Sequence, residues 1–416
     1  MAETGGRVRR RRVIYIPGYD PVPPRKYREL YRREGAAQAR LSGYCLALRP
    51  GGGAPAPGVF GWDVEGEIEG ARTRARIEVL GWSDIVKRSM AGGAAATYGH
   101  LLRTAWVYIG SGALFRLMRL RKGPVIAALY PVVVLLAQLA LALLAAGIAG
   151  RALAPLHPLA PWAGLALVPP VLWGFGRIDG RLYARYLMHD YAFSARCRGA
   201  DPPDLAARID AFADHVAAAL ADDVDEVLVV GHSSGAHIAV AVLARLVRAG
   251  RVPATGPALS LLTLGQAIPM VSFLPAAGPL RADLALLSRC DRLAWIDVSA
   301  PGDGCAFALC DPVAVSGAAG PGKRWPLVLS AAFTRTLSPE TRRRLRWRFF
   351  RLHYQYLCAF DALPGRADDY DYFRITAGPA TLARRLGARA PSPSRIERAL
   401  AGYAAGPGAP RAPQPA

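Results

Sequence analysis

Apolar and polar positions along the chain follow two periods, one typical of buried strands and one typical of amphipathic helices. Short apolar runs predict strands at residues 13–16, 59–64, 76–82, 227–230, 259–264, 293–298 and 346–350. Apolar positions three or four residues apart predict helices at 23–40, from 84 onward, and at 181–198, 203–221 and 280–288. Strands that alternate with helices in this way favour an α/β fold, with a mostly parallel sheet flanked by helices.

The sharpest change of period lies at residues 231–235, between the strand at 227–230 and a helical pattern that runs through residue 246. These five residues read Gly-His-Ser-Ser-Gly, a G-x-S-x-G motif centred on Ser233. Between a strand and a helix, this spacing predicts a nucleophile elbow, a tight turn that lifts the serine oxygen clear of the sheet. Gly231 and Gly235 let the strand and the helix pass closely. Ser233 is therefore the candidate nucleophile.

A second change of pattern isolates residues 123–176, in which Arg151 is the only formal charge. Residues 123–150 are long and apolar enough to span a bilayer, and residues 152–176 form a second candidate span that five prolines interrupt. The alternative is a pair of buried helices in a large core. Two uncharged runs of this length, joined by a very short turn, favour a helical transmembrane hairpin.

Charge and composition suggest what surrounds this hairpin. The chain has 52 Lys and Arg against 31 Asp and Glu, a formal net charge of +21, and 52% of its residues are hydrophobic. A basic balance is typical of proteins that bind nucleic acid or an anionic membrane surface. The hydrophobicity, and the lack of basic motifs interleaved with aromatic residues, favour membrane lipids as partners over nucleic acid.

The basic residues also predict an orientation. They flank both ends of the expected hairpin, at Arg103, Arg116, Arg119, Arg121, Lys122, Arg177, Arg181 and Arg185. Because positive residues stay on the cytoplasmic side, we expect an integral membrane protein with two transmembrane helices and the rest of the chain in the cytoplasm. Residues 101–120 mix aromatics, leucines and arginines at helical spacing, so we expect them along the membrane surface.

These patterns divide the chain into parts. Residues 1–84 and 201–400 form two parts of one α/β domain, and residues 85–200 form an inserted helical region with the transmembrane hairpin at about 123–176. Residues 50–58 are expected to be a flexible connector, and residues 401–416 a disordered tail. Because the six cysteines lack metal-ligand spacing and no Gly-rich phosphate loop occurs, we expect neither a metal nor a cofactor.

The order of these elements, with a Gly-containing loop after the first strand and GHSSG after a later one, resembles the α/β-hydrolase superfamily. The resemblance is to its lipase- and esterase-like members, and it covers residues 12–84 and about 200–360. It implies a serine, an acid and a histidine in that chain order. It also implies an oxyanion hole formed by the backbone N–H of Ser234 and one from Gly18 or Tyr19.

The resemblance places the acid in the loop after the strand at 293–298. Asp303, flanked by glycines, fits that loop best, while Asp297 inside the strand and Asp311 further on remain alternatives. Of the seven histidines, only His353 lies downstream of this acid. It follows the expected strand at 346–350 and is the candidate base.

Together these features predict a membrane-anchored serine hydrolase that cleaves an acyl or lipid ester. Ser233, Asp303 and His353 would form the triad, and the reaction would pass through an acyl-enzyme. The same machinery would serve an acyltransferase or a thioesterase. A non-catalytic membrane scaffold with an α/β-hydrolase-like fold is the alternative outside enzymes.

Overall fold

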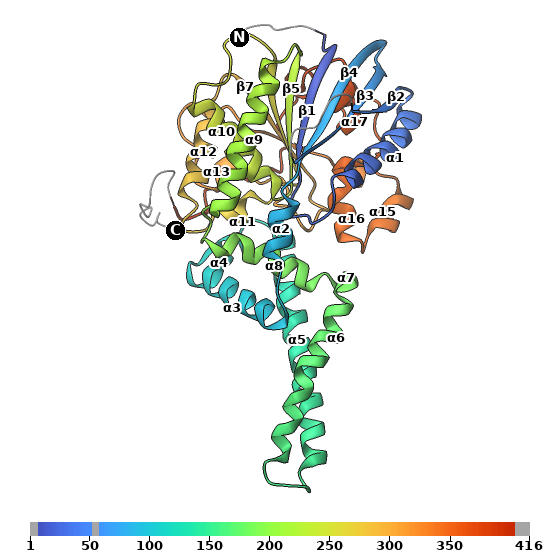
Figure 1. Ribbon diagram of the computed structural model, residues 1–416. Helices are drawn as coiled ribbons and strands as arrows, with labels where there is room; N and C mark the ends of the chain where they lie inside the picture. The colour runs from blue at the N-terminus through green and yellow to red at the C-terminus, as the bar shows by residue number, and fades with distance from the viewer. Residues whose placement is uncertain (1–6, 52–57, 404–416) are drawn as a thin grey trace.

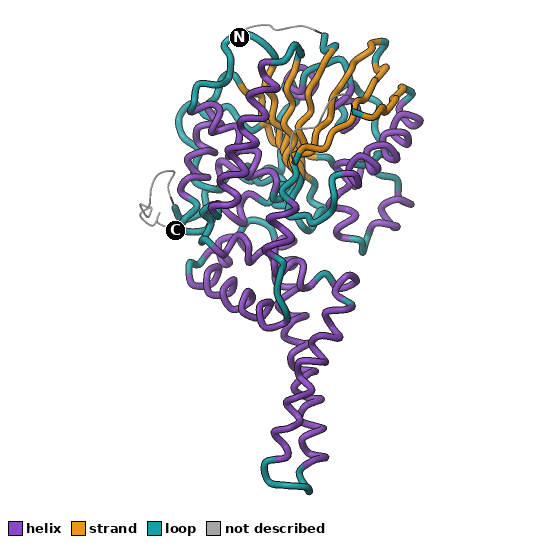
Figure 2. Tube along the Cα trace, viewed as in Figure 1, coloured by secondary structure: helices purple, strands orange, loops and turns teal. Residues whose placement is uncertain are grey.

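The computed structural model describes residues 7–51 and 58–403, and it contains one eight-stranded sheet with helices on both faces (Figures 1 and 2). The strand order is β2-β3-β4-β1-β5-β6-β7-β8. Neighbouring strands from β4 to β8 are parallel, whereas β3 is antiparallel to β2 and β4. The expected α/β fold with a mostly parallel, helix-flanked sheet is confirmed. The strands are β1 Arg10–Ile16, β2 Cys45–Pro50, β3 Val59–Ile68, β4 Ala71–Leu80, β5 Glu226–His232, β6 Ala258–Leu264, β7 Leu293–Ser299 and β8 Leu327–Ser330.

Each face of the sheet buries its own apolar layer, because successive residues of a strand point to opposite faces. Ile14 and Val229 pack under α9 (Pro203–Ala221), α10 (Gly235–Arg248) and α12 (Gly278–Arg289). Val13 and Val230 pack on the other face, under α1 (Arg25–Ser42), α17 (Tyr372–Ala377) and α18 (Leu382–Leu386). Short helices complete this part of the chain: α11 Ile268–Ser272, α13 Pro312–Val315, α14 Phe333–Thr336, α15 Pro339–Leu345, α16 Phe349–His353 and η2 Tyr354–Leu357.

The prediction of a strand at residues 346–350 is wrong. The chain turns at residues 346–348 and then enters α16, while the last strand of the sheet is β8, which pairs with β7. The aromatic residues that suggested a strand, Trp347 and Phe349, are exposed rather than buried in a sheet. The edge strand β2 was not expected, because its apolar run at residues 45–48 is short and only one of its faces is partly covered.

Between β4 and β5 the chain leaves the sheet at the carboxyl ends of the parallel strands (Figure 1). The helices next to this edge form what we call the cap. From the cap a long projection extends away from the sheet, and we call it the arm. The cap contains α2 Ser83–Ser89, α3 Ala94–Gly110, α4 Ala113–Met118, α7 Asp179–Leu182 and α8 Ala184–Arg196, and the arm contains α5 Lys122–Leu153, η1 Ala160–Leu167 and α6 Val168–Arg177.

Only the first of the two expected spans is a single long helix. By length and composition, α5 is the one helix among the described residues that is long and apolar enough to cross a membrane. The returning side is divided into η1 and α6, and α6 begins with prolines in its first turn. A proline lacks the N–H that continues a helix, so the proline-rich sequence of residues 155–170 breaks this side into two pieces.

Small residues hold the two sides of the arm together. A Cβ atom on Gly164 would lie 2.2 Å from the Ala146 carbonyl oxygen, and one on Gly150 would lie 2.5 Å from that of Pro161. The outer face of the arm is apolar and exposed. In the described chain, all large exposed hydrophobic side chains except Leu41, Trp347 and Phe349 fall between residues 102 and 183.

Two expectations concern residues whose structure is not described. Most of the connector expected at residues 50–58 and most of the tail expected at 401–416 lie outside the described residues.

Candidate active site

The GHSSG motif forms a sharp turn between β5 and α10, with Ser233 at its corner. Ser233 has a φ of +56°, in the left-handed region that non-glycine residues rarely adopt. A Cβ on Gly231 would lie 2.7 Å from the Ala236 Cα, and one on Gly235 would lie 2.2 Å from the Ile16 carbonyl oxygen. Both glycines are therefore required by close packing. The turn holds Ser233 in a strained conformation of the kind found at functional sites.

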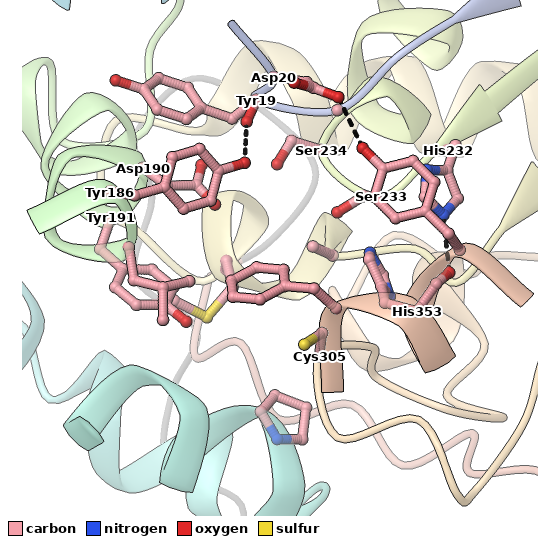
Figure 3. Close-up of a pocket in the computed structure, with 17 residues that line it drawn as sticks. Tyr19, Asp20, Tyr186, Asp190, Tyr191, His232, Ser233, Ser234, Cys305 and His353 are labelled. Atoms are coloured by element: carbon pink, nitrogen blue, oxygen red, sulfur yellow. Dashed lines mark hydrogen bonds between the residues drawn. The ribbon is translucent and has the colours of Figure 1, made fainter. Parts of the chain in front are cut away.

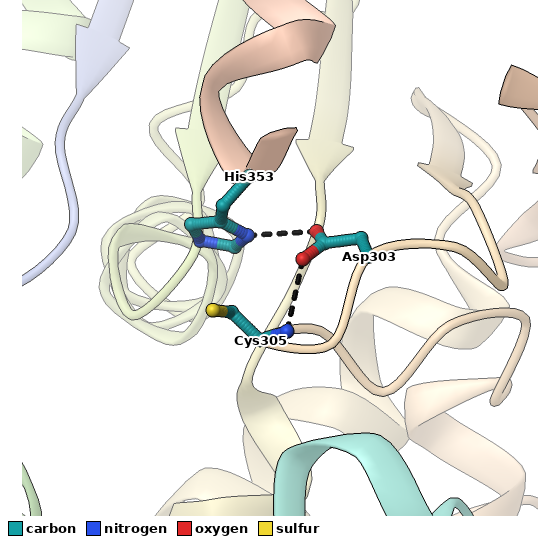
Figure 4. A group of neighbouring side chains, drawn as sticks. All are labelled: Asp303, Cys305 and His353. Atoms are coloured by element: carbon teal, nitrogen blue, oxygen red, sulfur yellow. Dashed lines mark hydrogen bonds and ion pairs between the residues drawn. The ribbon is translucent and has the colours of Figure 1, made fainter. Parts of the chain in front are cut away.

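Asp303 and His353 are brought together from positions fifty residues apart (Figure 4). The Nδ1 of His353 and the Oδ2 of Asp303 are 2.7 Å apart, and both side chains are buried. Asp303 also accepts hydrogen bonds from the Cys305 N–H at 2.9 Å and the Tyr356 hydroxyl at 3.0 Å. Burial favours the protonated acid, but His353 and these hydrogen bonds outweigh it and lower the pKa of Asp303. Asp303 is thus held as a carboxylate that accepts from His353 Nδ1–H.

The other ring nitrogen of His353 is free to act. Its Nε2 is buried and has no hydrogen-bond partner among the described residues. Ser233 and His353 border the same pocket (Figure 3), although no hydrogen bond joins them in this state. Hydrogen bonds between a nucleophile and its base are often long without substrate.

His232 fixes the backbone that carries His353. Its Nε2 donates to the His353 carbonyl oxygen at 3.0 Å, and the two rings lie 4.7 Å apart. Burial lowers the pKa of His232 to about 3, so this ring stays neutral.

The two alternative acids have other partners. Asp297 accepts from the Thr263 hydroxyl at 2.6 Å, inside the sheet. Asp311 accepts from the first N–H groups of α13 and forms an ion pair with Lys323 at 2.7 Å. Neither contacts His353, so Asp303 is the one of the three candidates that the structure brings to the histidine.

Residues proposed for the oxyanion hole line a pocket of about 70 Å³ together with Ser233 and His353. Gly18 lies so close that a Cβ there would be 2.9 Å from the Cβ of Ser233. Within the described chain, the backbone N–H groups of Tyr19 and Ser234 donate to no other residue. Both are therefore available to an oxygen that enters the pocket.

A hydrogen-bond network connects the loop after β1 to the histidine, and little in the sequence predicts it. Asp20 accepts from the hydroxyls of Tyr27 and Tyr354, both at 2.6 Å, and from the Val22 N–H at 2.8 Å. Tyr354 directly follows His353, so the loop and the histidine hold each other in place. The alternation of tyrosines in His353-Tyr-Gln-Tyr356 was the available signal for these partners.

A second group of side chains has the composition of a metal site. Ligand atoms of Asp303, Cys305 and His353 lie within 4.8 Å of one another (Figure 4). Their chemistry does not suit a cation. Burial raises the pKa of the Cys305 thiol far above its usual value, and the Asp303 oxygens are already held by N–H and O–H donors. A protonated thiol is a poor ligand, so a hydrogen-bonded pair fits this group better.

The chain was compared with known proteins on three levels. No family model, no curated protein and no solved structure matches it. The resemblance to the α/β-hydrolase superfamily and the roles of these residues therefore stay predictions.

Proposed function

We propose that the protein is a membrane-anchored serine hydrolase of the α/β-hydrolase type that cleaves an acyl ester. The proposal depends above all on one observation: a strained Ser233 and His353 border a single pocket, and the buried carboxylate of Asp303 lies behind His353, at hydrogen-bond distance from its Nδ1. A structural turn needs no positive φ at a serine, and a packed histidine needs no buried carboxylate. The three occur together in the chain order serine, acid, histidine.

The residues have separate tasks in this reaction. His353 Nε2 takes the proton of Ser233 as the serine oxygen attacks the ester carbonyl, and Asp303 holds the imidazole in the required tautomer. The N–H groups of Tyr19 and Ser234 bind the oxyanion, each contributing about 3–4 kcal/mol. His353 then gives the proton to the leaving alcohol, which leaves an acyl group on Ser233. Water activated by His353 releases the acid.

A second cavity supports an acyl chain on the substrate. It has a volume of about 100 Å³ and lies between α3, α4, α5 and α8, with a lining that is apolar except for Thr104 and the tyrosine hydroxyls. Tyr191 and Met270 form walls of both this cavity and the catalytic pocket. An acyl chain attached to Ser233 would therefore have an apolar site directly beside it, partly formed by Val125 and Leu129 at the base of the arm.

The exposed arm supports membrane anchoring. Its apolar outer face would cost free energy in water and gain it in lipid. Basic residues flank both ends of the arm, which supports a cytoplasmic position for the catalytic domain. A substrate that partitions into the bilayer would then reach the pocket from the membrane surface.

Labelling with a fluorophosphonate, which reacts with activated serines, tests the proposal. Membranes containing the wild type, Ser233→Ala and Ser394→Ala would be compared, since Ser394 is an exposed serine outside the site. We expect labelling of the wild type and Ser394→Ala but not of Ser233→Ala. If labelling does not depend on Ser233, the hydrolase proposal fails. Oxygen esters, thioesters and acyl acceptors then separate the hydrolase from a thioesterase or an acyltransferase.

A further inference from the structure

Helix α8 of the cap carries a carboxyl group into the catalytic pocket. Asp190 lines this pocket together with Ser233 and His353 (Figure 3). It forms no hydrogen bond or ion pair with any described residue. The other aspartates of the site differ, since Asp20 has three hydrogen-bond donors and Asp303 has three.

The surroundings of Asp190 do not compensate its charge. The nearby tyrosine hydroxyls of Tyr19 and Tyr186 are engaged elsewhere, with Ser89 and with the Tyr19 carbonyl oxygen. Burial raises the pKa of Asp190 to about 7, although the nearby His353 partly opposes this. A carboxyl group without a partner inside a pocket lowers the stability of the fold. Unpaired groups of this kind are typical of ligand-binding sites.

The two cavities suggest which part of the substrate Asp190 meets. The apolar cavity suits the acyl chain, so the alcohol portion of the ester would occupy the catalytic pocket. An acid group there accepts hydrogen bonds from hydroxyl groups but offers nothing to a plain alkyl chain. A site that binds a substrate hydroxyl also rejects analogues without it, because its own polar group is then left unpaired.

We propose that Asp190 is a specificity-determining residue that accepts a hydrogen bond from a hydroxyl on the alcohol portion of the substrate. The enzyme then prefers acyl esters of a polyhydroxylated alcohol, such as glycerol, over esters of simple alkanols. This inference rests on the proposed function, because it assigns the leaving-group side of the same pocket.

The test compares kcat/KM for octanoyl esters of glycerol, 1-propanol and choline, with purified full-length protein in detergent. Asp190→Leu removes the acceptor and keeps a similar shape in an apolar setting, and Asp190→Asn restores an acceptor oxygen. Asp291→Asn is the control, since Asp291 is an exposed aspartate before β7, at the opposite end of that strand from Asp303. We expect the glycerol-to-propyl ratio to fall by about tenfold or more in Asp190→Leu. Asp190→Asn should recover part of the ratio, and Asp291→Asn should keep the wild-type ratio.

The other outcomes separate this inference from the proposed function. An unchanged ratio in Asp190→Leu, with hydrolysis still dependent on Ser233, overturns the role of Asp190 and leaves the hydrolase proposal standing. In the choline ester, the alcohol portion carries a positive charge but has no O–H or N–H. An equal loss with the choline ester therefore indicates charge attraction and overturns the hydrogen bond. If no ester is cleaved in a Ser233-dependent way, the proposed function itself fails.

Discussion

The turn at Ser233 and the arm both depend on glycines packed against carbonyl oxygens, yet their surroundings are opposite. A Cβ on Gly235 would lie 2.2 Å from the Ile16 oxygen, and a Cβ on Gly164 would lie 2.2 Å from the Ala146 oxygen. Around the turn, every residue of β5 is buried. In the arm, only 22% of the most apolar stretch of α5 is buried.

This difference teaches what each region requires from outside. Strand β5 and helix α10 bury their apolar residues against the protein itself, so the turn is complete without any other partner. The two sides of the arm pack against each other along a narrow contact, and the apolar outer surface of the arm has no partner among the described residues. We therefore expect changes at the turn to alter catalysis and stability, and changes in the arm to alter location.

Asp303→Asn tests this division most strongly. The amide removes the carboxylate that fixes the His353 tautomer, so kcat should fall by about 10⁴-fold while membrane association is unchanged. The measurement is ester hydrolysis, with sedimentation of membranes alongside. Asp297→Asn is the control, because Asp297 does not contact His353. A fall of less than about tenfold in Asp303→Asn would contradict the assignment of the acid.

Removing the outer part of the arm tests the other side of the comparison. Replacement of residues 137–173 with a short Gly-Ser turn leaves Val125 and Leu129, which line the apolar cavity, but the remaining apolar segment is too short to span a bilayer. Most of the protein should move to the soluble fraction and still react with a fluorophosphonate at Ser233. Retention in the membrane would indicate that α3 and α4, with their exposed Leu102, Trp106 and Phe115, are sufficient for binding.

Gly235→Ala and Gly147→Ala compare the two regions by one added methyl group. At Gly235 the methyl would meet the Ile16 carbonyl, so the free energy of unfolding should fall by about 2–4 kcal/mol. At Gly147, on α5, nothing lies within 4 Å, and alanine should stabilise the helix by up to about 1 kcal/mol. Thermal unfolding in detergent measures both. Equal effects would mean that the turn is not as tightly packed as described.

The smallest expected effect concerns pH. Burial, with a contribution from Asp311, raises the pKa of Asp297 to about 8. The ordinary value is about 4, so between these values the folded protein holds a proton that the unfolded chain releases. The free energy of unfolding therefore falls as pH rises from about 4 toward 8. Relative to wild type, Asp297→Asn should gain up to about 1.4 kcal/mol between pH 6 and pH 7. A constant difference would show that Asp297 is ionised in the folded state.

The fold was predictable where the pattern of apolar residues was regular. The β-branched run before Ser233 and the helical spacing after it defined β5 and α10, and the long uncharged run defined α5. The error at residues 346–350 has a physical reason. Aromatic residues such as Trp347 favour buried strands, but here they are exposed, and the sequence does not tell which neighbours would cover them.

Within the site, the sequence identified the groups that have a motif or a fixed chain order. Gly18, Ser233 and His353 border one pocket, and Asp303 binds His353. Asp190 could not be found in this way, because it lies in the inserted region and reaches the pocket only through the packing of the cap. The partners of Asp20 were equally hidden, since Tyr354 is 334 residues away in the chain.

The position of β1 in the sheet has a consequence for the order of synthesis. β1 pairs with β4 on one side and with β5 on the other, and the chain that contains the cap and the arm is made between those two strands. The ribosome therefore completes the arm before Ser233, Asp303 or His353 exists. If the arm enters the bilayer as it emerges, the nascent chain is already tethered when β5 joins β1 and the turn closes on Ile16. Under the proposed function, the turn at Ser233 would then first form next to the membrane.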